Sequence, residues 1–229
     1  MSESASPQAV YVYQAPLRLW HWINAGAIAV LAVSGYLIGS PLPSLSGEAS
    51  QHFLMGDIRF IHFTAAYVFA VGFLGRIYWA FAGNHYAREL FLPPLFSGAW
   101  WKGMLTELRW YLFMEKESHV FIGHNPLAQL FMFLMFVLGS LFMLMTGFAL
   151  YAEGLGPHSW AEALFGWVVP LFGGNPQTVH TWHHLGMWFI VCFVIVHIYV
   201  AIREDIVSRQ TMVSTMINGW RLFKDKRAD

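Results

Sequence analysis

Four long apolar stretches, nearly free of charge, constrain the fold of this chain more than any other feature of its sequence. A helix needs about 20 mostly apolar residues to cross a bilayer. Only 11% of the 229 residues are charged, less than half of the roughly 25% in an average soluble domain. We therefore predict an all-α integral membrane protein, a bundle of four transmembrane helices over residues 22–39, 60–82, 127–151 and 185–202.

The chain begins with a polar segment, residues 1–16. This segment lacks the basic start, the short apolar core and the small-residue cleavage site of a removable signal peptide. We expect it to be disordered, and we expect the first span to stay in the membrane. The sequence contains no internal repeat and no separate soluble domain. Residues 1–229 are therefore predicted to form a single transmembrane domain.

The distribution of Lys and Arg predicts the orientation, because loops rich in these residues remain in the cytoplasm. Arg59 is the only basic residue in the two loops that would lie outside, and residues 152–182 contain none. We therefore predict a multi-pass membrane protein with both termini in the cytoplasm. Its cytoplasmic basic residues would be Arg18, Arg88, Lys102, Arg109, Lys116, Arg203, Arg209, Arg221, Lys224, Lys226 and Arg227.

Two further segments have the composition of helices that lie at the membrane surface. Residues 100–113 mix five aromatic side chains with Lys102, Glu107 and Arg109, and residues 159–169 contain Trp160 and Trp167. We expect amphipathic interfacial helices at both places. The alternative is that these aromatic residues only form the belt that borders a membrane protein.

Composition leaves histidine as the main residue for cofactor chemistry. The single cysteine, Cys192, excludes a disulfide framework, a Cys-ligated iron–sulfur cluster and covalently attached haem. Equal numbers of basic and acidic residues, 13 of each, speak against a basic nucleic-acid-binding protein. Eleven histidines remain, and ionisable side chains within membrane spans indicate functional sites.

The fourth span offers a geometric test of its histidines. At about 100° per residue, His183 lies within about 40° of His197 around the helix, whereas His180 and His184 lie about 100° and 140° away. His183 and His197 therefore share one face, separated by about 21 Å along the helix axis. His180 remains the alternative to His183 as a ligand.

The predicted topology pairs these histidines with two others. His62 and His183 lie toward the outer side, and His21 and His197 toward the cytoplasmic side. Each pair could supply the two axial ligands of a b-type haem between facing helices. A zinc ion would need further Cys, His or carboxylate ligands, and the spans supply no carboxylate. The plainer alternative is that each histidine is a polar residue at a helix end.

At these residues the chain resembles the b-type cytochrome subunits of membrane-bound nickel–iron hydrogenases, over nearly its whole length. The membrane cytochromes of formate dehydrogenases are more distantly similar. The matching motifs are Arg18-Leu-Trp-His-Trp22, Ser34-Gly-Tyr36, Phe60-Ile-His-Phe63, Arg76-Ile-Tyr-Trp-Ala-Phe81, Ile122-Gly-His-Asn-Pro126, His180-Thr-Trp-His-His-Leu-Gly-Met187 and His197-Ile-Tyr-Val-Ala-Ile-Arg-Glu-Asp205.

The resemblance implies an electron-transfer subunit with two b-type haems, held by His21, His62, His183 and His197. It implies that the chain binds a periplasmic hydrogenase, both the small subunit with its membrane helix and the large subunit. Electrons from hydrogen would pass through the haems to quinone, and no hydrogen chemistry would occur on this chain. The alternative within the same class is the cytochrome subunit of a formate dehydrogenase or a similar quinone-linked oxidoreductase.

Three further residues have two interpretations each. Arg76 could extend to the cytoplasmic surface, or it could pair with a haem propionate. His124 and Asn125 could hydrogen-bond a quinone, as polar residues at this position do in the formate dehydrogenase relatives. Asn125 followed by Pro126 is also the pattern of a helix N-cap, and the two roles are compatible.

Two other classes of function fit the sequence less well. A transporter would carry acidic residues within its spans or interrupted helices in repeated halves, and this chain has neither. A membrane anchor with structural histidines would bind no haem, so that its visible spectrum would show no haem absorption.

Overall fold

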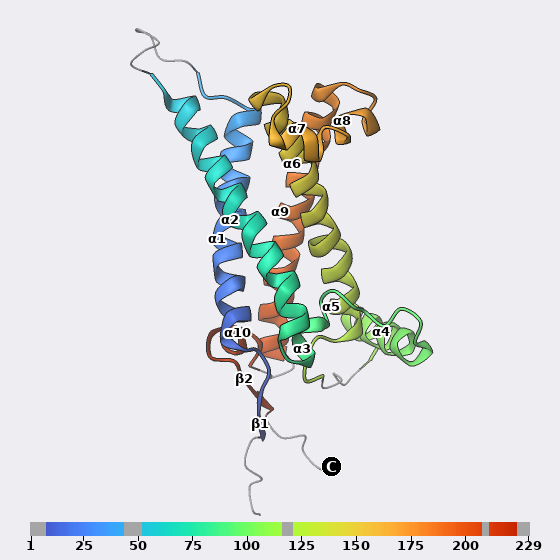
Figure 1. Cartoon of the computed structure of the whole chain (residues 1–229). Helices are drawn as coiled ribbons and strands as arrows, with labels where there is room; N and C mark the ends of the chain where they lie inside the picture. The colour runs from blue at the N-terminus through green and yellow to red at the C-terminus, as the bar shows by residue number, and fades with distance from the viewer. Residues whose placement is uncertain (1–7, 44–51, 116–120, 208–210, 224–229) are drawn as a thin grey trace, which may run out of the picture. The chain divides into compact units, whose positions relative to one another are not determined.

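The computed structural model describes residues 8–43, 52–115, 121–207 and 211–223, and these residues are mostly helical (Figure 1). Its elements are, in chain order, β1 (Gln8–Tyr11), α1 (Ala15–Gly39), α2 (Leu54–Ala82), α3 (His85–Arg88), α4 (Gly98–Tyr111), α5 (Pro126–Phe131), the π-helical segment η2 (Met132–Leu138), α6 (Gly139–Leu155), α7 (Trp160–Phe165), α8 (Val168–Leu171), α9 (Pro176–Val207), α10 (Met212–Asn218) and β2 (Trp220–Phe223).

Four helical segments among the described residues are long and apolar enough to cross a membrane: α1, α2, the continuous run Pro126–Leu155, and α9. Each of the four predicted spans lies within one of these candidate membrane helices. Each helix extends beyond its apolar stretch; α9, for example, starts at Pro176 rather than near residue 185. Proline is favoured in the first turn of a helix because its missing N–H is not needed there.

The third span contains a stretch of π-helix. Residues Met132–Leu138 form η2 between α5 and α6. A π-helical turn holds more residues than an α-helical turn, and such turns occur frequently at functional sites. The N-cap predicted at the start of this span is confirmed, since Asn125 Oδ1 accepts a hydrogen bond from the Ala128 amide at 2.7 Å.

Packing divides the chain into two compact units. Unit 1 comprises Met1–Trp22, Gly75–Leu134 and Val194–Asp229, and unit 2 comprises Ile23–Leu74 and Met135–Phe193. All four spanning segments contribute residues to both units. A single domain over residues 1–229 stays a prediction, and we describe each unit by itself.

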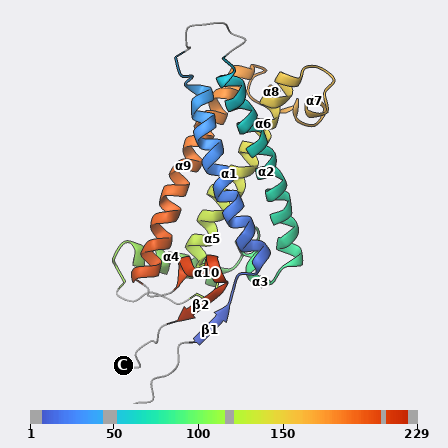
Figure 2. The same cartoon turned by 90° about the vertical axis from the view of Figure 1, so that its left-hand side faces the viewer.

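In unit 1, a two-stranded antiparallel sheet joins the two ends of the chain (Figure 2). β1 pairs with β2, with Gln8 opposite Phe223 and Tyr11 opposite Trp220. The helix α10 precedes β2 and accepts two side-chain hydrogen bonds from α1, one from Arg18 to the Ile217 carbonyl and one from Trp22 to the Met216 carbonyl.

Two expectations are corrected by this sheet. Residues 8–16 are ordered where we expected disorder, and the fold is not entirely helical. The reason is that the hydrogen-bond partners of β1 lie more than 200 residues away, so that the N-terminal sequence alone does not reveal them. The described part of the chain does not include residues 1–7 or the basic residues Lys116, Arg209, Lys224, Lys226 and Arg227.

Helices form where amphipathic helices were predicted, as α4 and as the short pair α7 and α8. Ser97 caps α4, because its hydroxyl accepts a hydrogen bond from the Trp100 amide at 3.3 Å. The α4 side chains Trp100, Glu107 and Trp110 are buried. A place for these helices at the membrane surface stays a prediction.

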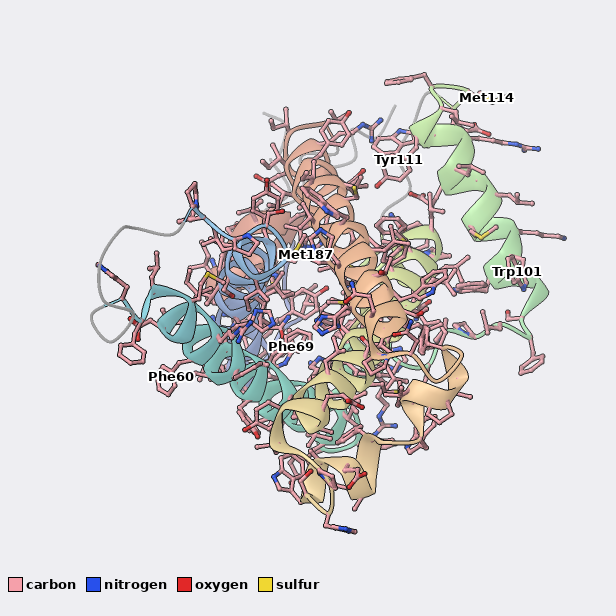
Figure 3. The ribbon with its side chains drawn as sticks, turned by 90° about the horizontal axis from the view of Figure 1, so that it is seen from above. Phe60, Phe69, Trp101, Tyr111, Met114 and Met187 are labelled. Carbon is pink, nitrogen blue, oxygen red and sulfur yellow. The ribbon has the colours of Figure 1, made fainter. Side chains whose placement is uncertain are left out.

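The spanning helices carry large apolar side chains on their exposed faces, as the lipid environment requires. On α2, Phe60 points outward and is 71% exposed, whereas Phe69 points inward and is 6% exposed (Figure 3). A soluble protein would not expose so many apolar side chains along one helix. The opposite faces of these helices are buried, and the few polar side chains on the buried faces need specific contacts.

Candidate haem sites

In unit 2, His62 is oriented by a hydroxyl group on a neighbouring helix. His62 lies on α2, and its Nδ1 atom is 2.9 Å from Ser34 Oγ on α1. The Ser34 hydroxyl donates its own hydrogen to the Val30 carbonyl, one helical turn earlier, at 2.6 Å.

His183, also in unit 2, has the same arrangement on the other two helices. It lies on α9, and its Nδ1 atom is 2.7 Å from Thr146 Oγ1 on α6. The Thr146 hydroxyl donates to the Phe142 carbonyl at 2.8 Å. Both histidines therefore contact a hydroxyl group that has already donated its only hydrogen.

These contacts determine which ring nitrogen carries the proton. A hydroxyl group with its hydrogen already donated can only accept from the imidazole. Nδ1 must then be protonated in both rings, and Nε2 keeps a free lone pair. A metal-bound histidine commonly has this arrangement, with its other N–H donated to a neighbouring group. The side chains of His62 and His183 therefore each leave Nε2 free to bind a metal.

Each of these histidines also packs against a glycine next to its hydroxyl partner. A Cβ atom on Gly35 would lie 3.2 Å from His62 Cε1, and one on Gly147 would lie 3.1 Å from His183 Cε1. Both distances are tighter than ordinary van der Waals contact, so a larger residue would push on the ring. The Ser34-Gly35 and Thr146-Gly147 pairs therefore shape equivalent pockets for His62 and His183.

In unit 1, His21 and His197 face each other from α1 and α9. Their ring centroids are 6.3 Å apart and their planes are inclined at 53°. Because imidazole nitrogen binds a metal at about 2 Å, two ligands on opposite sides of one metal ion have centroids about 6 Å apart. Among the described residues, the buried Nδ1 atom of His21 has no hydrogen-bond partner. The pair fits a bis-histidine site.

The other histidines of α9 differ from His183. His180 is exposed. His184 accepts a hydrogen bond from Trp188 within the same helix, at 3.2 Å. His184 also packs against Gly39 of α1, but His183 is the one whose Nδ1 atom forms a hydrogen bond with a side chain of a neighbouring helix in unit 2. That contact supports His183 as the ligand and leaves His180 for another role.

The donor groups fit haem better than a free metal ion. Within the described ranges, no group of three or more His, Cys, Asp or Glu side chains comes together as a metal site. Structural zinc needs four such ligands and catalytic zinc at least three. A porphyrin supplies four nitrogen donors itself, and two histidines complete its coordination.

Arg76 is buried in unit 1, with only 3% of its surface exposed. Its Nη2 atom donates to the Ala87 carbonyl at 2.7 Å, and its guanidinium lies over the rings of Trp20 and Phe91 at 5.4 and 5.2 Å. Its buried Nε and Nη1 atoms have no partner in the described part of the chain. The burial favours an anionic ligand over an arginine extended to the surface.

His124 and Asn125 are in contact with two acidic residues that the sequence did not single out. The His124 amide donates to Glu89 at 2.9 Å, and His124 Nδ1 lies 3.1 Å from the same carboxylate oxygen. Asn125 Nδ2 donates to Glu107 at 3.2 Å while its Oδ1 caps α5. The two candidate quinone residues are thus part of a larger polar cluster in unit 1.

That cluster continues to α9 through Tyr111, which points from α4 toward α9 (Figure 3). The Tyr111 hydroxyl donates to Glu204 at 2.8 Å, and Arg203 contacts the same oxygen at 3.3 Å. Burial raises the pKa of the Tyr111 hydroxyl well above its usual range, and nearby Glu204 adds to the shift. Tyr111 therefore stays protonated and donates its hydrogen.

Burial shifts the pKa values of two charged side chains in this cluster, Glu107 and Arg221. Burial, and then the charge of Glu204, raise the pKa of Glu107 to about 7. Burial lowers the pKa of Arg221, whose Nη1 atom donates to the Ile122 and Gly123 carbonyls at 2.8 and 3.0 Å. Burial thus brings the change in charge of Glu107 close to neutral pH.

Comparison with known proteins matches the chain to one family. The model for the prokaryotic cytochrome b561 family matches residues 12–219. The chain is similar to a protein of Azotobacter vinelandii named as a probable Ni/Fe-hydrogenase B-type cytochrome subunit, with 66% identity over 96% of this chain and 92% of the relative. A protein of the same name in Cupriavidus necator is 60% identical over 98% of this chain and 92% of the relative. A similar subunit of Escherichia coli hydrogenase 1 is 52% identical over 93% of this chain and 91% of the relative.

Proposed function

Since this chain belongs to the prokaryotic cytochrome b561 family and is a hydrogenase-associated b-type cytochrome subunit that transfers electrons in a membrane, we propose that it connects a periplasmic nickel–iron hydrogenase to the quinone pool. It would do so with two b-type haems, each held by two histidines. The names of its relatives favour this role over that of a formate dehydrogenase subunit.

His62 and His183 would hold one haem in unit 2, and His21 and His197 the other in unit 1. When bound, each haem supplies an iron that gains and loses a single electron. The observation that carries the proposal is the matched pair of hydroxyl contacts, Ser34 to His62 and Thr146 to His183. These contacts hold each imidazole in one orientation and one tautomer, with Nε2 free.

Other residues of the chain would hold the remaining parts of the haem. Gly35 and Gly147 leave room beside the ligand rings. Arg76 would neutralise a propionate group, because two of its buried nitrogen atoms lack a partner in the described ranges.

The distribution of charge supports an orientation with unit 1 toward the cytoplasm. Arg59 is the only Lys or Arg in the residue ranges of unit 2, and basic residues are concentrated on the cytoplasmic side of membrane proteins. Both termini would then lie in the cytoplasm of a bacterium, and the protein would span its inner membrane.

The hydrogenase would bind to unit 2 on the periplasmic side. The predicted contact regions are residues 40–59 and 152–182, of which residues 44–51 lie outside the described part of the chain. The second region exposes Trp160, Leu164 and Trp167, and aromatic residues are enriched in the cores of protein interfaces. The partners would be the small subunit, with its membrane helix, and the large subunit.

Quinone would be reduced at the polar cluster of unit 1. The Asn125 amide, which also hydrogen-bonds Tyr111, and the Nε2 atom of His124 would lie beside the quinone, while Glu107 and Glu89 hold the two side chains in place. Protons for the product would come from the cytoplasm, through the polar residues of this cluster, including Arg203.

Proteoliposomes that contain the whole hydrogenase complex test this function. Hydrogen added to them should reduce quinone and should build a membrane potential that is negative on the side of the C-terminal tail. A protonophore should abolish the potential and leave quinone reduction running. Quinone reduction without any potential would contradict the inward path of electrons, and the absence of quinone reduction would contradict the proposed acceptor.

A further inference from the structure

Glu107 is an acid on the buried face of α4, where the other buried side chains are Trp100 and Trp110. Its side chain is 3% exposed. One carboxylate oxygen, Oε2, accepts the hydrogen bond from Asn125 Nδ2 at 3.2 Å. The other oxygen, Oε1, is buried and has no hydrogen-bond partner among the described residues. A permanently charged carboxylate would be costly in such a place.

The charged groups around Glu107 make that cost larger. From α9, Glu204 brings a second negative charge, which is stabilised by the Tyr111 hydroxyl and by Arg203. From the start of α5, His124 is paired with Glu89 rather than with Glu107. From β2, Arg221 donates to the Ile122 and Gly123 carbonyls.

Arg203 contacts its sequence neighbour Glu204 and the aromatic rings of α4. Its guanidinium stacks over the rings of Trp110 and Tyr111 at 4.1 and 4.8 Å and contacts Glu204. None of the ion pairs found within the described ranges includes Glu107. Burial and the neighbouring charge of Glu204 therefore act in the same direction, and they raise the pKa of Glu107 to about 7.

We propose that Glu107 is the proton donor for quinone reduction, acting beside Asn125 at the polar cluster of unit 1. This inference rests on the proposed function. Asn125 connects the two, because its amide donates to Glu107 and its side chain is one of those we place beside the quinone. Oε1, the oxygen without a partner among the described residues, would carry the transferable proton.

The step balances with the electrons that hydrogen oxidation supplies. Reduction of one quinone to hydroquinone takes two electrons and two protons. The neutral carboxyl group of Glu107 gives one proton to a quinone oxygen and becomes a carboxylate. It then takes a proton from the cytoplasmic water, and the same cycle supplies the second proton. Proton transfer by a positioned group accelerates such steps most when its pKa is near the working pH.

The first test compares Glu107→Gln with Glu115→Gln in the purified hydrogenase complex. Glu115 is exposed and follows α4, so it receives the same change outside the cluster. Glu107→Gln should slow hydrogen-driven quinone reduction by about 100-fold, whereas Glu115→Gln should not. Glu107→Asp should recover part of the rate with a shifted pH profile. Haem content and hydrogen-driven reduction of a soluble dye should stay unchanged in all three.

Infrared difference spectroscopy of the wild-type complex tests the same claim without relying on a variant. A protonated carboxyl group should be visible at pH 6, should disappear as the pH rises above 7, and should be absent from Glu107→Gln. If Glu107→Gln reduces quinone at the wild-type rate, or if no carboxyl group titrates near pH 7, the role of Glu107 is overturned. If the wild-type complex itself does not reduce quinone, the proposed function fails with it.

Discussion

At the scale of single residues, the sequence predicts the haem ligands, and the structure adds the side chains that hold those ligands in place. Helical periodicity alone singles out His183 among the histidines of the fourth span. The hydroxyl partners Ser34 and Thr146 are not predictable in this way. Serine and threonine inside helices usually bond to the carbonyl four residues earlier, as both do here, and the sequence does not show a second contact to another helix.

Removal of these hydroxyl groups should weaken haem binding without removing a ligand. Ser34→Ala should weaken the site of His62, and Thr146→Val that of His183, because the imidazole loses the acceptor that fixes its orientation. Changes in groups that orient a metal ligand typically lower metal affinity about 10- to 100-fold. Haem retention during detergent washing, followed by absorption spectroscopy, measures the effect.

The controls for this prediction lie on the same helix. Thr146→Ser keeps the hydroxyl and should keep the haem. Ser140→Ala removes a buried hydroxyl of α6 that has no partner among the described residues, and it should also keep the haem. Equal loss of haem from Ser140→Ala and Thr146→Val would show that the contact with His183 has no special role.

Glycine substitutions should distinguish packing beside the ligands from packing elsewhere. Gly35→Ala and Gly147→Ala add a Cβ 3.2 and 3.1 Å from the ligand rings, and each should shift the absorption spectrum of the haem in unit 2. Gly26→Ala on α1 meets no atom within 4 Å, and it should leave the spectrum unchanged and stabilise the helix slightly. Identical spectra for all three variants would contradict the packing that we describe.

At the scale of elements, hydropathy predicted the four membrane helices but not their polar ends. The apolar stretches identify the spans because a bilayer demands internally hydrogen-bonded helices. The sheet β1–β2 and the cluster of Glu107, Asn125 and Tyr111 depend on contacts between distant segments. Glu107 and Glu204 are 97 residues apart and follow no periodic pattern, so neither could be assigned to a site from the sequence.

The packing of α4 should depend on pH through Glu107. The folded-state pKa of Glu107 is about 7, whereas its ordinary value is 4.5. Between these values the folded state binds a proton that the unfolded state has lost. The stabilisation is therefore complete below about pH 4.5 and is lost as the pH rises through 7. Glu107→Gln should abolish this dependence.

Hydrogen exchange of the α4 amides measures this pH dependence. The wild type and Glu107→Gln are compared at each pH from 5 to 8. Protection of α4 in the wild type should decrease relative to the variant as the pH rises. A constant ratio between the two proteins across this range would mean that Glu107 has an ordinary pKa, and the elevated value would be wrong.

At the scale of the whole molecule, the family and the four spans follow from the sequence, and the orientation follows only from the distribution of charge. A cysteine-labelling experiment on intact cells tests it. In a Cys192→Ser background, a cysteine at Leu164 in α7 should react with a membrane-impermeant reagent, and one at Leu112 after α4 should react only in opened cells. The reverse pattern would place the termini outside.

The central claim is that His62 and His183 hold one haem and His21 and His197 hold the other. A redox titration of the purified complex, followed in the haem absorption bands, should show two components in the wild type and in His180→Ala. His62→Ala and His183→Ala should lose the same component, and His21→Ala and His197→Ala should lose the other. Loss of one identical component from His62→Ala and His197→Ala would contradict this pairing.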